Sequence, residues 1–295
     1  MRAAVTVTRP ATLADLSELA ALQARWETAW LGGVESDADE VRETLEPCIP
    51  LAGHSRLVLD GPSIVGAAWW HGHESSFLVD PAVDAGPAGA MLLDWLATTD
   101  VDHLDVLGED TALQATLTAR GWRHDRSAFD LIRAVTPDWV LDEPRWDDGI
   151  EVRPSEPDDA AAMHRLLYVD AGWADIAGHP HRSFDEWRSL FVTPADKPEQ
   201  QVLAWRGERL VGVATGRVFS DGGGWIAQLA VARNERGHGL GRALLLEGLR
   251  RRQAAGATSL GLSVQATNRA ALALYLSVGL GIEREWMNFV PPRAR

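Results

Sequence analysis

The sequence predicts an α/β (α+β) protein built from two copies of one domain plan. Segment 9–15, which opens with Arg-Pro and ends on Asp before an apolar helix pattern, returns as segment 153–159. Segment 59–67, which holds a glycine turn and then Val-Gly, returns as segment 205–213. The spacing between the copies grows from 144 to 146 residues, as a duplication with small insertions would leave it. A chain of 295 residues has a comfortable length for two domains.

The order of patterns predicts the same elements in each copy. Helices come first, because apolar residues recur at helical spacing after each Arg-Pro segment. A β-hairpin follows, which turns at Gly61 in the first copy and at Gly207 in the second. A strand, a loop and a helix come next, and a strand with a further helix completes the copy.

The join between the copies is expected in residues 136–149. This stretch contains Pro137, Pro144 and several acidic residues, a composition that is typical of a linker. We therefore expect two domains, at residues 1–140 and 149–295.

The composition is that of an ordinary globular protein, with 46% hydrophobic and 24% charged residues. The longest apolar runs are too short to cross a bilayer, and the N-terminus lacks the apolar core of a signal peptide. We expect a cytoplasmic protein without a membrane partner. The single cysteine, Cys48, excludes an intramolecular disulfide and a cysteine-based metal cluster.

The formal charge of −14 argues against a nucleic-acid partner, because proteins that bind phosphate backbones usually carry a basic surface. The same charge suits a cationic small-molecule partner such as an amine. A homodimer is kept as an open alternative to a monomer.

The glycine-rich segment 229–243 combines a short apolar strand, a turn and the start of a helix. Gly237, Gly239 and Gly241 let the backbone approach a ligand, and the helix beginning near Leu240 adds unpaired N–H donors and a partial positive charge. The spacing fits neither the dinucleotide fingerprint nor the Walker loop. The segment predicts a cradle for a phosphate or pyrophosphate, with a ligand-free strand-to-helix connection as the alternative.

Arg236, Gly239 and Gly241 fill the acyl-CoA loop pattern of the GNAT superfamily of acyltransferases, which is Arg or Gln, two residues, Gly, one residue, then Gly or Ala. Segment 268–279 matches the family's N-x-x-A-x-x-L-Y-x-x-x-G, although Leu280 stands where the family has Phe. The chain thus resembles a tandem GNAT N-acetyltransferase. The resemblance implies two GNAT-fold domains, each a mixed, mostly antiparallel twisted sheet flanked by helices, with acetyl-CoA as co-substrate.

The resemblance also implies which residues hold acetyl-CoA. Backbone groups of the strand before the loop bond the pantetheine arm and polarise the thioester carbonyl. Loop amides hold the pyrophosphate, and Arg236 or Arg242 adds positive charge. The expected cofactor-binding residues are Leu229, Ala230, Val231, Arg236, Gly237, His238, Gly239, Leu240, Gly241, Arg242 and Asn268.

By the same resemblance, Tyr275 is the acid that protonates the leaving thiolate. Many GNAT enzymes have a Glu base on the strand before the loop, where this chain has Gln228. Gln228 cannot accept a proton, but it could position a water molecule. Glu285, on the expected last strand, is a substitute candidate for the base.

The acceptor is expected to bind the segment between the first two helices of the second copy, residues 168–181, which we call the acceptor segment. Trp173 could stack on the acceptor, while Asp170 and Asp175 could pair with an ammonium group. Both acids and His179 are further alternatives for the base. The two histidines of this segment lack further ligands at useful spacing, so no metal is expected.

The first copy keeps the plan but loses the loop chemistry. Alignment on the preceding strand puts Asp84 at the position of Arg236 and Pro87 at the position of Gly239. Proline removes an N–H donor, and aspartate adds a negative charge beside a pyrophosphate. Leu117 occupies the position of the expected acid. We expect one acyl-CoA per chain.

These observations predict an N-acetyltransferase that transfers an acetyl group from acetyl-CoA to a primary amine of a small molecule or peptide. The tandem plan with a degenerate first half is similar to that of mycothiol synthases, which makes an amino-sugar conjugate an alternative acceptor. A regulatory pseudoenzyme that binds acyl-CoA is the other alternative, because no base is evident.

Overall fold

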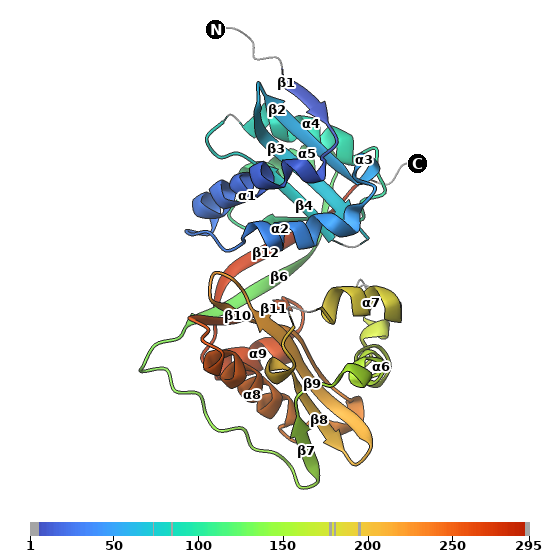
Figure 1. The fold of residues 1–295 in the computed structure, drawn as a ribbon, viewed down its shortest axis with the longest axis vertical. Coiled ribbons are helices and arrows are strands. Elements are labelled where there is room, and N and C mark those ends of the chain that lie inside the picture. The colour runs from blue at the N-terminus through green and yellow to red at the C-terminus, as the bar shows by residue number, and fades with distance from the viewer. Residues whose placement is uncertain are drawn as a thin grey trace. The chain divides into compact units, whose positions relative to one another are not determined.

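A computed structural model divides the chain into two compact units (Figure 1). It describes residues 6–72, 74–83, 85–176, 179, 181–193 and 196–292. The first unit comprises Met1–Ala128 with Glu285–Arg295, and the second comprises Phe129–Arg284. The stretch expected as a linker, 136–149, therefore lies inside the second unit. Within the described ranges, no helix is both long enough and apolar enough to cross a membrane.

The second unit contains the helices, hairpin, strand, loop and helix in the predicted order. Its described elements are the end of β6 (Arg123–Ala134), β7 (Ile150–Arg153), η3 (Pro157–Asp159), α6 (Ala160–Arg165), the π-turn η4 (Leu166–Asp170), η5 (Trp173–Asp175), α7 (Phe184–Phe191), η6 (Pro198–Gln200), β8 (Val202–Arg206), β9 (Arg209–Val218), β10 (Gly223–Val231), η7 (Arg233–Glu235), α8 (Leu240–Ala254), β11 (Ser259–Gln265), α9 (Arg269–Ser277) and the start of β12 (Gly281–Val290).

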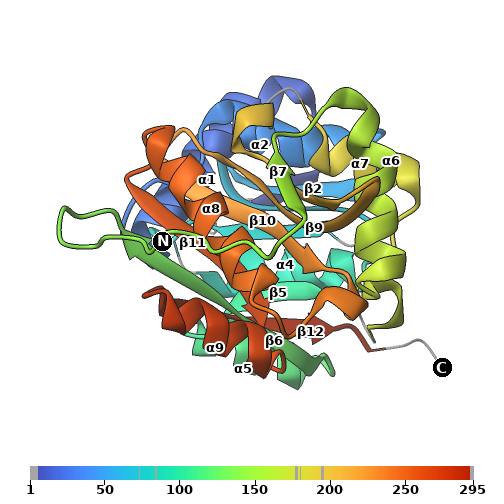
Figure 2. The ribbon, with the colours of Figure 1, turned by 90° about the horizontal axis from the view of Figure 1, so that it is seen from below.

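The sheet of the second unit is mixed and is covered by helices on both faces. Its strand order is β7-β8-β9-β10-β11-β6; neighbours from β7 to β10 are antiparallel, and β10 is parallel to β11. Val202 and Ala204 of β8 pack with Leu244 of α8, while Leu203 packs with Met163 of α6. Figures 1 and 2 show these two helices on opposite faces. The predicted mixed, mostly antiparallel sheet flanked by helices is confirmed.

The first unit repeats this plan. Its described elements are β1 (Thr6–Arg9), η1 (Leu13–Asp15), α1 (Leu16–Trp30), α2 (Ala38–Leu45), η2 (Glu46–Cys48), α3 (Leu51–His54), β2 (Ser55–Asp60), β3 (Ser63–His71), β4 (Glu74–Val79), α4 (Ala85–Leu96), β5 (Leu104–Leu107), α5 (Thr111–Ala119), the start of β6 and the end of β12. Strands β1 to β4 form an antiparallel sheet in chain order.

Each unit is completed by a strand end from the other half of the sequence. In the first unit, β12 pairs antiparallel with β5, with Trp286 opposite Leu107. In the second unit, β6 lies beside β11, and Ser263 Oγ donates to Asp130 at 2.5 Å. This exchange is why the structure does not divide at one point in the linker.

The two copies share local contacts, residue for residue. Arg9 donates through both terminal nitrogens to Asp15 at 2.7 and 2.6 Å, and Arg153 donates in the same way to Asp159 at 2.7 and 2.7 Å. Each arginine also donates to the carbonyl of the proline that follows it, at 3.0 Å. The β2–β3 and β8–β9 hairpins carry a register shift at equivalent positions. The sequence repeat therefore corresponds to a structural repeat.

A buried histidine in the first unit has a strongly shifted titration. His103 is 8% exposed, and its Nδ1 lies 2.7 Å from Asp102 while its Nε2 lies 3.5 Å from Asp105. Burial opposes the charged form, but the interactions with both carboxylates outweigh it and raise the pKa of His103 to about 9.

We expect this histidine to make the free energy of unfolding depend on pH. Its pKa is about 9 in the folded protein and about 6.5 when unfolded, so its stabilisation is complete below about pH 6.5. The stabilisation, on the order of 3 kcal/mol, is lost as the pH rises through about 9. Urea unfolding of the wild type and of His103→Gln at about pH 6 and about pH 9.5 measures it. The difference between the two proteins should shrink at the higher pH, and an unchanged difference would contradict the assignment.

Candidate active site

The loop between β10 and α8 presents a row of unpaired backbone amides. Gly237 and Gly239, on either side of the exposed His238, have φ angles of +87° and +88°, and a Cβ built on either glycine would meet no atom within 4 Å. The N–H group of Ala243 donates to the Gly239 carbonyl at 3.0 Å. Within the described part of the chain, the N–H groups of residues 237–242 have no such acceptor. An anion at this turn would meet free donors and the positive end of the helix dipole.

Glu235 fixes the base of this loop to the β8–β9 hairpin. Its Oε2 accepts from Nε and Nη2 of Arg206 at 3.1 and 3.0 Å, and its Oε1 accepts from Arg209 at 2.5 Å. The Glu235 side chain is only 12% exposed, which limits screening by solvent. The start of the loop at Glu235 is therefore anchored to the hairpin, whereas no such contact holds the glycine turn that follows it within the described residues. No local pattern predicts these contacts, because both arginines lie more than twenty residues upstream.

Strands β10 and β11 separate beside the loop. Their parallel pairing ends where Ile226 lies opposite Leu262, while β10 stays paired with β9 as far as Val231. A register shift directly after Ile226 bulges β10 at this point. The second half of β10 thus has one open edge.

The backbone groups of Leu229 and Val231 face this open edge. The N–H group of Ala232 donates to β9 at 2.9 Å, and successive residues of a strand alternate in direction. The backbone groups of Leu229 and Val231 therefore point away from β9, whereas those of Ala230 face it. The Val231 carbonyl already accepts from Nε of Arg236 at 3.1 Å. The N–H groups at the edge are placed as donors for a carbonyl oxygen.

The side chains of the two arginines expected to add charge are engaged elsewhere. Nη2 of Arg236 donates to the carbonyl of Ala171 at 2.7 Å. Arg242 donates to Asp142 at 2.7 Å and to Ser277 at 2.9 Å. The charge of Arg242 is therefore compensated by a carboxylate, whereas Arg236 bonds only carbonyl oxygens and keeps its positive charge beside the loop.

Asn268 caps α9. Its Oδ1 accepts from the N–H group of Ala271 at 3.2 Å, just as Asp110 in the first copy accepts from Leu113 at 2.9 Å to cap α5. The φ and ψ angles of the two capping residues also agree, at −83° and 69° against −81° and 66°. Asn268 differs from its counterpart in carrying an amide N–H group, which only the second copy can offer to a ligand.

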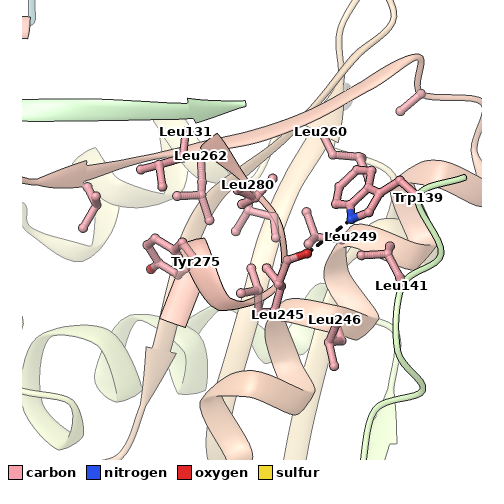
Figure 3. Close-up of a cluster of buried hydrophobic side chains, with 14 residues drawn as sticks. Leu131, Trp139, Leu141, Leu245, Leu246, Leu249, Leu260, Leu262, Tyr275 and Leu280 are labelled. Atoms are coloured by element: carbon pink, nitrogen blue, oxygen red, sulfur yellow. Dashed lines mark hydrogen bonds between the residues drawn. The ribbon is translucent and has the colours of Figure 1, made fainter. Parts of the chain in front are cut away.

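Tyr275 lies in the hydrophobic core of the second unit. It is 7% exposed and belongs to a cluster with Leu262 and Leu280. Figure 3 shows its ring at the margin of this cluster. Burial raises the pKa of Tyr275 to about 12, so the phenol keeps its proton at neutral pH. The residue can therefore donate a hydrogen bond or a proton, but it cannot act as a base at neutral pH.

The candidates for a base are not brought together. Gln228 is 3% exposed, and its Oε1 accepts from Nε1 of Trp187 at 3.3 Å and from Oγ1 of Thr215 at 3.4 Å. Glu285 is exposed and belongs to the first unit, where its carbonyl accepts from Gly108 at 2.7 Å. The structure therefore places Gln228, but not Glu285, in the second unit beside the open edge of β10.

The described part of the acceptor segment is an aromatic cluster. The ring of Trp173 lies 4.9 Å from that of His179 and 6.4 Å from that of Tyr168. Asp170 lies at the end of the π-turn, 3.8 Å from Arg165. The described residues contain no group of three His, Cys, Asp or Glu side chains able to hold a metal.

Asp175, the second acid of the acceptor segment, is paired with the loop. Its Oδ2 accepts from Nη2 of Arg233 at 2.5 Å. The sequence prediction of an ammonium partner at this position did not anticipate Arg233. Ala177, Gly178 and Pro180 of the acceptor segment lie outside the described residues.

The first copy has a different loop at the equivalent place. Helix α4 begins at Ala85 and includes Pro87, so the positions of the glycine turn in the second copy are helical here. Asp80 Oδ1 accepts from the N–H group of Ala82 at 2.9 Å, which puts a carboxylate among the loop amides. Asp84, predicted to oppose an anion, lies outside the described residues. The Asp80 carboxylate is paired with Arg25 at 2.8 Å, and it occupies the Ala82 N–H group that could otherwise meet an anion.

The chain is similar to known acetyltransferases in sequence. The Acetyltransferase (GNAT) family matches residues 161–280. A mycothiol acetyltransferase of Streptomyces coelicolor is 29% identical over 292 residues, covering 92% of each chain. A mycothiol acetyltransferase of Kineococcus radiotolerans is 31% identical over 242 residues, covering 79% of this chain and 75% of that protein.

Solved structures share the fold over the whole chain. A GCN5-related N-acetyltransferase from Sphaerobacter thermophilus has a TM-score of 0.77 at 21% identity and covers 98% of each chain. A tandem GNAT protein from the clavulanic acid biosynthesis pathway has a TM-score of 0.70 at 15% identity, covering 98% of this chain and 100% of that one. The chain therefore belongs to the GNAT family of acetyltransferases, in the tandem form that carries two domains of this fold.

Proposed function

We propose that the chain is an N-acetyltransferase that transfers an acetyl group from acetyl-CoA to a primary amine of a small molecule, through one site in its second unit. The unpaired amides of residues 237–242 carry this proposal, because they provide donors for a pyrophosphate at a helix N-terminus. The open edge of β10 next to them supplies backbone groups for the pantetheine arm. The first unit lacks this glycine turn.

The reaction joins the amine nitrogen to the thioester carbonyl carbon and breaks the bond from that carbon to sulfur. Bound acetyl-CoA supplies the activated acyl group. The N–H groups of Leu229 and Val231 at the open edge of β10 stabilise negative charge on the carbonyl oxygen. Tyr275 is the proposed proton donor to the departing sulfur; burial keeps it protonated but raises its pKa to about 12, so the transfer depends on a hydrogen bond to the sulfur as the carbon–sulfur bond breaks.

Gln228 is proposed to position water rather than to act as a base. Its Oε1 is held by Trp187 and Thr215, which orients the amide. The Nε2 group can then donate to the oxygen of a water molecule, and that water can accept the proton of the attacking amine. The amide of Gln228 cannot accept that proton itself.

The acceptor class is proposed from the acceptor segment and from the relatives. Trp173 offers an aromatic surface, and Asp170 offers a carboxylate for an ammonium group. The relatives are named mycothiol acetyltransferases, which supports an amino-sugar conjugate as the first acceptor to test.

A regulatory protein that binds acetyl-CoA without turnover is the second candidate. The observation that favours it is the amide at position 228 in place of a carboxylate. Retention of Tyr275 and Asn268 favours the enzyme.

Acceptor-dependent thiol release separates these two candidates. We expect the protein with acetyl-CoA to release thiol when an amino-sugar conjugate is added, and less when spermidine or a peptide N-terminus is added. A disulfide reagent detects the released CoA thiol and not the protein. The single cysteine, Cys48, is 1% exposed and burial raises its pKa to about 11, so it does not react. Binding of acetyl-CoA with no acceptor-dependent release would favour the regulatory protein.

A further inference from the structure

Two arginines of the cofactor loop hold the acceptor segment. Nη2 of Arg236 donates to the Ala171 carbonyl at 2.7 Å, while Nε of the same side chain donates to Val231 at 3.1 Å. Nη2 of Arg233 donates to Asp175 at 2.5 Å. One guanidinium thus ties the end of β10 to the residue after the π-turn, and the other ties η7 to η5. We call Arg233, Arg236, Ala171, Gly172 and Asp175 the clamp.

Gly172 makes the close approach of Arg233 feasible. Its φ angle is +78°, and a Cβ at this position would lie 1.9 Å from Nη2 of Arg233. Any other residue would both strain the backbone and displace the guanidinium. The acceptor segment is therefore shaped to receive an arginine from the cofactor loop.

The first copy provides an internal comparison, because it lacks the glycine turn and also lacks the clamp. By the same alignments, Pro81 stands at the position of Arg233 and Glu27 at that of Ala171. Helix α1 runs without interruption over Leu16–Trp30, whereas α6 gives way to the π-turn. Glu27 is 2% exposed and binds its own following loop, accepting from Ser36 Oγ at 2.6 Å. The first copy ties its loop to α1 with the opposite polarity, because Arg25 of the helix donates to Asp80 of the loop at 2.8 Å. Among the described residues, loop arginines that reach the acceptor segment therefore occur only in the copy with the unpaired amides.

We propose that Arg233 and Arg236 are positioning residues that couple acetyl-CoA binding to the order of the acceptor segment. This inference rests on the proposed function. Arg236 is directly followed by the amides that would receive the pyrophosphate, so an anion that fixes this turn also fixes the backbone carrying both arginines. The hydrogen bonds of the two arginines then restrain Ala171 and Asp175. Reciprocally, an ordered acceptor segment favours cofactor binding by the same factor.

Hydrogen exchange of the full chain, with and without CoA, tests the coupling. The amides of Ala171, Asp175 and Ile176 are bonded within the acceptor region, to Leu166, Gly172 and Trp173 at 2.7, 3.1 and 3.1 Å, and report its opening. We expect saturating CoA to slow exchange in peptides covering 232–243, and to slow exchange in peptides covering 166–176 by at least about 5-fold.

Two variants assign the coupling to the arginines. In Arg236→Met, and in the double variant with Arg233→Met, CoA should still protect 232–243 but no longer protect 166–176. Arg236→Lys, which keeps one donor, should retain part of the protection. The control is Arg250→Met, an arginine of α8 paired with Glu143 at 2.7 Å outside the clamp, which should behave as wild type.

The outcomes separate the two proposals. Protection of 232–243 without any change at 166–176 in the wild type overturns the coupling while leaving the cofactor site intact. Persistence of protection at 166–176 in the double variant overturns the role of the arginines. Absence of protection at 232–243 in the wild type overturns the proposed function, and the coupling with it.

Discussion

Replacing Gly239 with proline is expected to weaken acetyl-CoA binding by about 100-fold or more, which removes it from a calorimetric titration. Proline fixes φ near −65°, whereas Gly239 has a φ of +88°. The substitution therefore distorts the turn and also deletes one of the N–H donors in residues 237–242. Gly239→Ala keeps the N–H group and should cause a smaller loss.

The opposite end of the same helix supplies the control. Gly256 follows α8 with a φ of +92°, and a Cβ there also meets no atom within 4 Å. Gly256→Pro should lower the free energy of unfolding at least as much as Gly239→Pro, because it also removes an N–H group that donates to Gln253 at 3.0 Å, but it should leave acetyl-CoA affinity unchanged. Tight binding by Gly239→Pro, or equal losses of affinity in both variants, would place the cofactor elsewhere.

Replacing Tyr275 with phenylalanine is expected to lower kcat about 100-fold, the effect of losing a positioned acid. The dissociation constant of acetyl-CoA should stay within about twofold, because the ring and its packing in the core are kept. Since the phenol has a pKa of about 12, its loss should not create a new dependence on pH near neutrality. Steady-state rates and a calorimetric titration on the same preparation measure both quantities.

A second substitution separates chemistry from packing. Tyr275→Leu reproduces the residue that the first copy has at this position, Leu117, which is fully buried. Thermal unfolding should detect the lost ring in Tyr275→Leu but not in Tyr275→Phe. A kcat within twofold of wild type for Tyr275→Phe would remove the phenol from the reaction.

Short sequence patterns predict the structural features that depend on residues close together in the chain. The glycine turn requires positive φ at Gly237 and Gly239, and that requirement is visible in the sequence. The α9 cap at Asn268 and the paired Arg-Asp contacts of the repeat are also short-range. These features, with the order of elements, are sufficient to predict the mixed sheet of the second copy.

Contacts between distant segments are not visible in such patterns. Glu285 lies on the last strand, β12, as the sequence predicts, but the pairing of β12 with β5 joins residues far apart in sequence and places Glu285 in the first unit. The sequence predicts that Arg236 or Arg242 adds positive charge at the loop. In the structure, Arg236 donates to the Ala171 carbonyl and Arg242 donates to the Asp142 carboxylate, both from distant parts of the sequence. The sequence did not predict a role for Arg233, because its partner, Asp175, lies in the acceptor segment.

A calorimetric titration of the unmodified full chain with acetyl-CoA tests the central claim most directly. The account predicts one site per chain, because among the described residues only the second unit has the glycine turn with its unpaired amides. No binding, or two equivalent sites per chain, would contradict it.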